Sequence, residues 1–177
     1  MSTDVKALLK LVKRRETTVD MCLRGDLAGE YDALSKQLAN LPAGAERLNG
    51  DPERQRLQAE LDRIAGEMAE GTVPFVLRAL PQAEFQMLID SHPPRRVGDD
   101  VNEADARSGF NRATFYRTLI PASVVEPALD AQEWALLFDV GLSQGQFMKL
   151  AAAAMEVNGD PVDVPFSSAA SNGSPAS

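Results

Sequence analysis

Cysteine and histidine each occur only once in the 177 residues, as Cys22 and His92. A single cysteine excludes an intramolecular disulfide, and one cysteine with one histidine cannot supply a zinc site of the usual Cys/His spacing. Proteins of a reducing cytosol are typically built without disulfides, so we expect this chain to belong to that compartment.

Long apolar segments are also missing from the chain. The residues from Met1 to Lys6 lack the apolar stretch of a signal peptide, and no apolar run approaches the ~20 residues that a membrane helix needs. Hydrophobic residues make up 44% and charged residues 25%, which is typical of soluble globular proteins. We therefore expect a soluble intracellular protein of one ordinary domain or two small ones, with no membrane partner.

Basic residues are outnumbered by acidic ones, which gives a formal net charge of -8 and a pI near 4.7. A nucleic-acid partner is not expected, because phosphate neutralisation needs clustered lysine and arginine. The basic cluster near the start comprises Lys10, Lys13, Arg14 and Arg15. An apolar face predicts a helix over about residues 4–15, and the cluster is better explained as its dipole-complementing last turn than as a site for an anionic partner.

Two apolar stripes dominate the first half of the chain. Spacings of three and four residues predict one helix over residues 26–41 and another over 52–70; the stripes are Leu27, Tyr31, Leu34, Leu38, Leu57, Leu61, Ile64 and Met68. Asp26 and Asp51 stand where the helices begin and are expected to cap them, with Pro52 in the favoured first position. Two such stripes joined by a loop predict an antiparallel helical hairpin.

Alternating sequences flank this hairpin and predict strands over residues 17–23 and 72–78. The apolar faces are Val19, Met21 and Leu23 in the first strand and Val73, Phe75 and Leu77 in the second. Because the hairpin brings the strands together, we expect a two-stranded antiparallel ribbon at its base. Pro74 restricts its strand to an edge or a small sheet, and a lone ribbon needs a third strand or another packing surface.

Short helices punctuated by proline are predicted for the second half. One helix around Phe85 ends at His92-Pro-Pro94, and residues 95–109 show no period and predict a polar surface loop. A further helix is predicted over residues 111–119, and Pro121 is expected to end it. A pattern typical of a capping box at Asp130 opens one further helix, and Ser143-Gln-Gly-Gln146 opens the last one. A Pro-, Ser-, Ala- and Gly-rich composition predicts a disordered tail.

Together these patterns predict a mostly α fold. It consists of an antiparallel helical hairpin with a small two-stranded antiparallel β-ribbon at its base, a bundle of short helices and a disordered C-terminal tail. The expected regions are residues 1–79 for the hairpin with its flanking strands, 80–159 for the short helices packed on it, and 160–177 for the tail.

Several polar features invite a functional interpretation, and each has a simpler structural one. Arg24-Gly25-Asp26 matches a cell-adhesion tripeptide, but it falls at a strand-to-helix junction where glycine turns the chain. His92 has no catalytic partner near it in the sequence, so a turn or helix-end role is expected. A set of acidic residues lacks the pattern of a calcium loop and is expected in a solvated loop; the set is Asp99, Asp100, Glu103 and Asp105.

No residue is therefore assigned to catalysis, to a cofactor or to a metal. Gly141–Gly145 lacks the lysine of a phosphate-binding loop, and Trp134 and Phe147 are expected to belong to the core. The pattern indicates a non-enzymatic interaction protein, and it leaves open both the face that binds a partner and self-association.

A set of soft motifs in a fixed order covers most of the chain. They are Val19-Asp-Met-Cys-Leu-Arg-Gly-Asp-Leu27, Phe75-Val-Leu-Arg-Ala-Leu80, Phe85, His92-Pro-Pro-Arg95, Gly109-Phe-Asn111, Thr114-Phe115, Glu126-Pro127, Trp134, Gln146 and Val162-Asp-Val-Pro-Phe166. In order and spacing this set resembles the tail assembly chaperones of long-tailed, siphovirus-type phages that infect actinobacteria.

The resemblance implies a protein that binds and solubilises the phage tape measure protein until tail-tube subunits polymerise around it in the host bacterial cytoplasm. It also implies two forms, the longer made by a programmed ribosomal frameshift, of which this chain would be the shorter. The alternative is a structural tail or head–tail connector protein, which would be abundant in finished virions. A DNA-binding regulator is opposed by the net charge, and an enzyme by the sparse catalytic residues.

Overall fold

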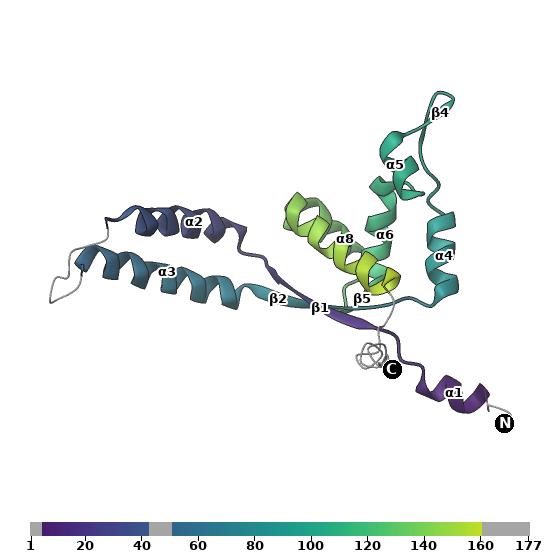
Figure 1. Ribbon diagram of the computed structural model, residues 1–177, viewed down its shortest axis with the longest axis horizontal. Coiled ribbons are helices and arrows are strands. Elements are labelled where there is room, and N and C mark those ends of the chain that lie inside the picture. The colour runs from purple at the N-terminus through teal and green to yellow at the C-terminus, as the bar shows by residue number, and fades with distance from the viewer. Residues whose placement is uncertain (1–4, 43–50, 161–177) are drawn as a thin grey trace, which may run out of the picture.

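The computed structural model describes residues 5–42 and 51–160, over which the chain is mostly helical, as the sequence predicts (Figure 1). The helices are α1 (Val5–Leu11), α2 (Gly25–Asn40), α3 (Pro52–Glu70), α4 (Gln82–Asp90), α5 (Glu103–Ser108), α6 (Arg112–Ser123), α7 (Ala131–Leu136), a π-helical turn η1 (Leu137–Gly141) and α8 (Gln144–Gly159). The strands are β1 (Glu16–Cys22), β2 (Thr72–Arg78), β3 (Arg96–Val97), β4 (Asp100–Val101) and β5 (Val124–Glu126). The disorder predicted for the tail concerns residues that lie almost entirely outside the described part.

The antiparallel ribbon between β1 and β2 is confirmed, with Val19 opposite Phe75 near its centre. The predicted number of strands was wrong, because β5 pairs with the other side of β2 and makes a three-stranded sheet in the order β1-β2-β5. β5 has only three residues, too few to show an alternating pattern in the sequence. The third strand gives the marginal ribbon the extra pairing that it needs.

Pro74 is accommodated although β2 is the central strand. The backbone hydrogen bond from Leu23 N–H to Gly71 O (2.9 Å) indicates that the odd-numbered residues of the ribbon are its hydrogen-bonded pairs. The backbone of Pro74 therefore points away from β1, on a side where β5 pairs only farther along the strand, around Val76. The missing N–H of proline costs no ladder hydrogen bond at this position.

Helices α2 and α3 form the predicted antiparallel hairpin, which extends away from the rest of the fold (Figure 1). The predicted stripes face each other; Leu27, Leu57, Leu61 and Ile64 are buried and the remaining members are half-buried. Asp51 caps α3 as expected, because its carboxylate accepts a hydrogen bond from Glu53 N–H at 3.0 Å. Local capping and periodicity therefore predict the hairpin correctly.

The junction between β1 and α2 corrects two predictions. Helix α2 begins at Gly25, which places Asp26 inside the first turn instead of at the cap. The Asp26 carboxylate accepts hydrogen bonds from the Arg24 guanidinium, with Nη2 and Oδ2 2.8 Å apart. Leu23, expected on the apolar face of the strand, lies beyond its end and is 39% exposed.

Helix α1 is shorter than the predicted residues 4–15, since it ends at Leu11. Of the basic cluster, only Lys10 lies in the last turn, so the dipole explanation fails for residues 13–15. Arg15 instead pairs with Glu156 of α8 at 3.1 Å, which attaches the segment after α1 to the last described helix.

Most of the predicted short helices are confirmed, and the capping box predicted at Asp130 is formed. The structure shows a second capping box at Ser143, where the last helix was expected to begin. Two predictions in this half were wrong. Residues 95–109 are not a loop, because they contain the β3–β4 hairpin and α5. Pro121 does not end its helix, since α6 continues to Ser123.

The main core lies between the sheet and helices α6 and α8. It joins Phe75 and Leu77 of β2 to Phe115 of α6 and Leu150 of α8, all essentially inaccessible to solvent. Alanines 151, 153 and 154 are buried too, and their small side chains let α8 approach its neighbours closely. Among the described helices, none combines the length and the apolar character that crossing a membrane requires.

Candidate binding groove

A short polar segment holds α5 against the start of α6. Asn102 caps α5 by accepting from two backbone N–H groups, and Asn111 caps α6 by accepting from the backbone N–H of Ala113. Gly109 ends α5 with φ at 79°, a left-handed conformation that glycine adopts without steric cost. The chain can therefore reverse between the two helices within a few residues.

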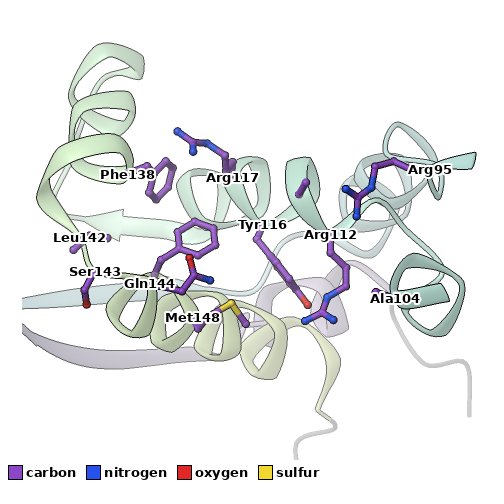
Figure 2. Close-up of a pocket in the computed structure, with 12 residues that line it drawn as sticks. Arg95, Ala104, Arg112, Tyr116, Arg117, Phe138, Leu142, Ser143, Gln144 and Met148 are labelled. Atoms are coloured by element: carbon purple, nitrogen blue, oxygen red, sulfur yellow. The ribbon is translucent and has the colours of Figure 1, made fainter. Parts of the chain in front are cut away.

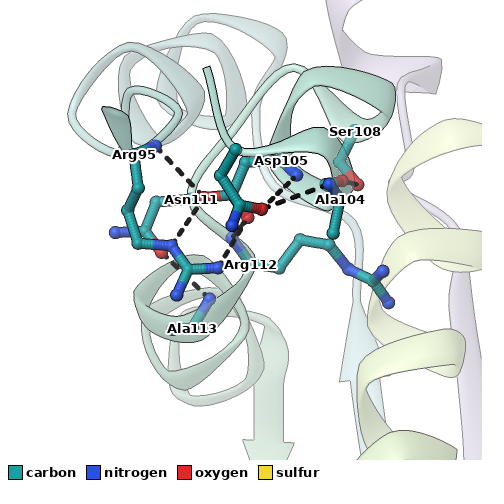
Figure 3. A network of polar contacts seen from close by, with 8 residues as sticks. Arg95, Ala104, Asp105, Ser108, Asn111, Arg112 and Ala113 are labelled. Carbon is teal, nitrogen blue, oxygen red and sulfur yellow. Dashed lines mark hydrogen bonds and ion pairs between the residues drawn. The ribbon is translucent and has the colours of Figure 1, made fainter. Parts of the chain in front are cut away.

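Asp105 is the centre of this junction and is fully buried, although the sequence predicted a solvated position. Its carboxylate accepts from Arg95 Nε (2.7 Å) and Nη2 (3.0 Å), and from the backbone N–H groups of Arg95 (3.1 Å) and Arg112 (3.2 Å), as Figure 3 shows. The hydrogen bonds from the Arg95 side chain lower the pKa of Asp105 far below its ordinary value, against the opposing effect of burial. Asp105 therefore stays ionised and fixes where α6 begins.

An open groove of about 440 Å³ lies beside this junction, between α6, η1 and the first turns of α8 (Figure 2). Its apolar part consists of Tyr116, Phe138, Leu142, Phe147 and Met148, all half-buried. Phe138 and Phe147 meet edge to face, with ring centroids 5.4 Å apart. The groove therefore offers partly exposed aromatic and thioether surface, which suits an apolar partner.

Three arginines line the same groove, and their electrostatic states differ. Arg95 is paired with the buried carboxylate, and Arg117 forms an ion pair with Asp139 while its guanidinium lies 5.3 Å from the centre of the Phe138 ring. The Arg112 guanidinium makes no hydrogen bond or ion pair with any residue in the described ranges. Arg112 is thus the cation that remains available to a ligand.

A second hollow of about 300 Å³ lies farther along α6, beside Pro121 and Trp134. The two hollows share Arg117 and Phe138 as lining residues. Along α6 the lining extends from Arg112 to Pro121, and nine residue steps of 1.5 Å make this ~14 Å, about two and a half helical turns. The two adjacent hollows, taken together as the groove along α6, therefore follow the length of this helix.

Apolar side chains are also exposed elsewhere on the protein. Helix α1 stands apart from the body in Figure 1 and carries Val5, Leu9 and Leu11, each at least 65% exposed. Leu136 and Val140, one helical turn apart in α7 and η1, are 64% and 78% exposed. An acidic protein thus presents several apolar surfaces to solvent.

The polar residues singled out in the sequence have structural roles. His92 follows α4 and lies at its end, with Nδ1 2.7 Å from Leu88 O and Nε2 3.2 Å from Thr118 Oγ1, which confirms the helix-end interpretation. Arg24 and Asp26 pair with each other at the predicted strand-to-helix junction. Trp134 is buried as expected, and Phe147 packs on the edge of the core.

The sequence did not point to the groove or to Asp105. A signal for α5 was present, because Asn102 and Gly109 are start and stop residues of a short helix with Asp105 in its first turn. Across residues 5–42 and 51–160, no three histidine, cysteine, aspartate or glutamate side chains converge as a metal site would need. No protein-family model, curated protein or solved structure gives a significant match to the chain.

Proposed function

We propose that this protein is a tail assembly chaperone of a siphovirus-type phage that binds the tape measure protein and keeps it soluble. The carrying observation is the combination of exposed apolar surface, on α1 and in the groove, with a chain of formal charge -8. A holding chaperone needs apolar surface to bind its client, and like charge keeps the coated complexes apart.

The motifs that resemble tail assembly chaperones occupy structural positions in this fold, which supports reading them as one ordered set. Phe75 and Phe115 are core residues, and Asn111 caps α6. Gln146 completes the capping box of α8 and donates a hydrogen bond to Cys22 O at 2.6 Å, which ties α8 to β1. A family that shares these positions would share the scaffold that forms the groove.

On this proposal the protein is not an enzyme and uses no cofactor. It acts on the tape measure protein in the host bacterial cytoplasm, where the tail-tube subunits are a second candidate partner. No nucleic-acid or membrane partner is proposed.

Co-expression with the very long helical protein encoded downstream in the same genome tests the proposal. The soluble fraction of that protein should rise, and the two should co-purify in about 1 M salt, where the Debye length is ~3 Å, because apolar contact dominates. A client that stays insoluble beside a folded, abundant chaperone would overturn the proposal.

Mass spectrometry of purified virions separates the proposed function from its alternative. A chaperone leaves when the tube closes and should be missing from finished particles. Many copies in each particle would assign the chain to the structural tail or head–tail connector proteins instead.

A further inference from the structure

We propose that the groove along α6 binds one face of a helix of the tape measure protein, with a client carboxylate on Arg112. This inference rests on the proposed function and adds to it the site and the chemistry of the client segment. The segment it requires is an amphipathic helix whose apolar residues recur every three or four positions, next to at least one aspartate or glutamate.

The dimensions of the groove favour a helical segment. Its lining extends ~14 Å along α6, and a client helix of the same length has about nine residues and presents three side chains on one face. The hollow beside Phe147 and the hollow beside Trp134 are two successive places for such side chains. Arg117 and Phe138, which both hollows share, lie between them.

The charge of the groove decides between two possible occupants. Helix α1 of a second copy is apolar and exposed, but it carries Lys10 in its last turn, and no acidic residue occurs between Val5 and Arg15. Placing this helix beside Arg112 would bring Lys10 and Arg112 together, and the helix itself offers no carboxylate to Arg112. An acid-bearing client helix satisfies Arg112 instead, so the groove is complementary to the client and not to α1.

The walls of the groove are held in place before any client arrives. The Asp105 carboxylate fixes the backbone of Arg112 at the start of α6, and the capping box at Ser143 fixes the start of α8. A ligand that meets a preformed site loses less free energy to ordering it. Because the walls are held by these contacts, single groove residues that take no part in them can be substituted without unfolding the protein.

Ala113→Glu is the main test variant. Ala113 is exposed, lines the groove and is the second residue of α6, where a glutamate is favoured by the helix dipole. The substitution therefore preserves the fold while it fills the groove and opposes an acidic client. Ala83→Glu is the matched control, because Ala83 is likewise exposed and the second residue of its helix, α4, but does not line the groove.

Charge reversal at Arg112 gives the second variant, with Arg56→Glu on the exposed side of α3 as its control. Labelled peptides of about 25 residues, tiled along the tape measure protein, serve as probes in fluorescence anisotropy with the full chain. We expect Ala113→Glu to weaken the best-binding peptide at least about tenfold and Arg112→Glu about fivefold, with both controls unchanged. Replacing the acidic residue of that peptide with lysine should restore its binding to Arg112→Glu.

The outcomes separate this inference from the proposed function. If wild-type protein solubilises the full-length client and binds its peptides, but both groove variants bind as well as wild type, the groove is not the site and the chaperone function stands. Equal losses in the two controls would likewise reject the groove, because the effect would then be one of net charge. If wild-type protein binds no peptide and solubilises no client, both the inference and the proposed function fail.

Discussion

The helical hairpin allows a sharp test of the fold, because its core is separate from the main core. Leu27, Leu57, Leu61 and Ile64 are buried between α2 and α3, and none belongs to the cluster that joins the sheet to α6 and α8. Replacing Leu61 with alanine should therefore destabilise the hairpin and leave the rest of the protein stable.

The size of the effect follows from the burial of the side chain. Leu61 is 5% exposed, and truncating a buried leucine to alanine costs ~2–5 kcal/mol. The hairpin has solvent on its outer faces and can partly close the space left behind, which favours the lower half of that range. Leu34 on the facing helix is only half-buried, so Leu34→Ala should cost about 1 kcal/mol.

Hydrogen exchange with mass spectrometry shows which helices lose stability. A loss of about 2.7 kcal/mol corresponds to ~100-fold faster exchange for amides that open with the hairpin. We expect this acceleration in α2 and α3 of Leu61→Ala, and a smaller one in Leu34→Ala. Amides of α8 should exchange at the wild-type rate in both variants.

Two results would refute the reasoning. Equal acceleration in α8 would show that the hairpin and the main core unfold as one unit. Unchanged exchange in α2 and α3 of Leu61→Ala would show that the leucine stripes do not hold the helices together.

Three further predictions concern the second half of the chain. The pKa of Asp105 is lowered in the folded state, so its ionised form stabilises the protein above the unfolded pKa of ~3.9, and this stabilisation is lost as the pH falls below that value. Asp105→Asn should therefore be less stable than wild type at neutral pH. In an acid denaturation experiment, its free energy of unfolding should fall less than that of wild type. Gly109→Ala should lower stability by about 1 kcal/mol in urea titration, because φ at 79° disfavours a side chain. Gln146→Ala should cost ~1–2 kcal/mol in the same assay, since it removes both a capping bond and the bond to Cys22 O, whereas Gln144→Ala, two residues earlier, should cost much less.

Features that depend on neighbouring residues in the chain were predicted well. The cap at Asp51, the capping box at Asp130, the start of the last helix at Ser143 and the leucine stripes all act within a few residues, so their sequence patterns report them directly. Even the pairing of β1 with β2 followed from local information, because a hairpin returns the chain to the place where it began.

Features that depend on distant contacts were missed. The predicted loop over residues 95–109 is polar in sequence, yet Asp105 is buried because Arg95, ten residues earlier, supplies both charge and hydrogen bonds. Likewise, β5 is a strand only because the open side of β2 is available to it. Neither the burial of a charged residue nor a three-residue strand leaves a period in the sequence.

The amino-acid sequence by itself determined the mostly helical class, the hairpin, the caps at Asp51 and Asp130 and the acidic balance of the chain. Only the tertiary structure decided that α6, η1 and α8 line an open groove and that the Arg112 guanidinium lacks a partner among the described residues while the guanidinium groups of Arg95 and Arg117 have one. The physical reason is the distance along the chain between the interacting residues. Caps and periodicity are fixed by side chains a few residues apart, whereas the availability of a charge depends on residues that meet only after the chain has folded.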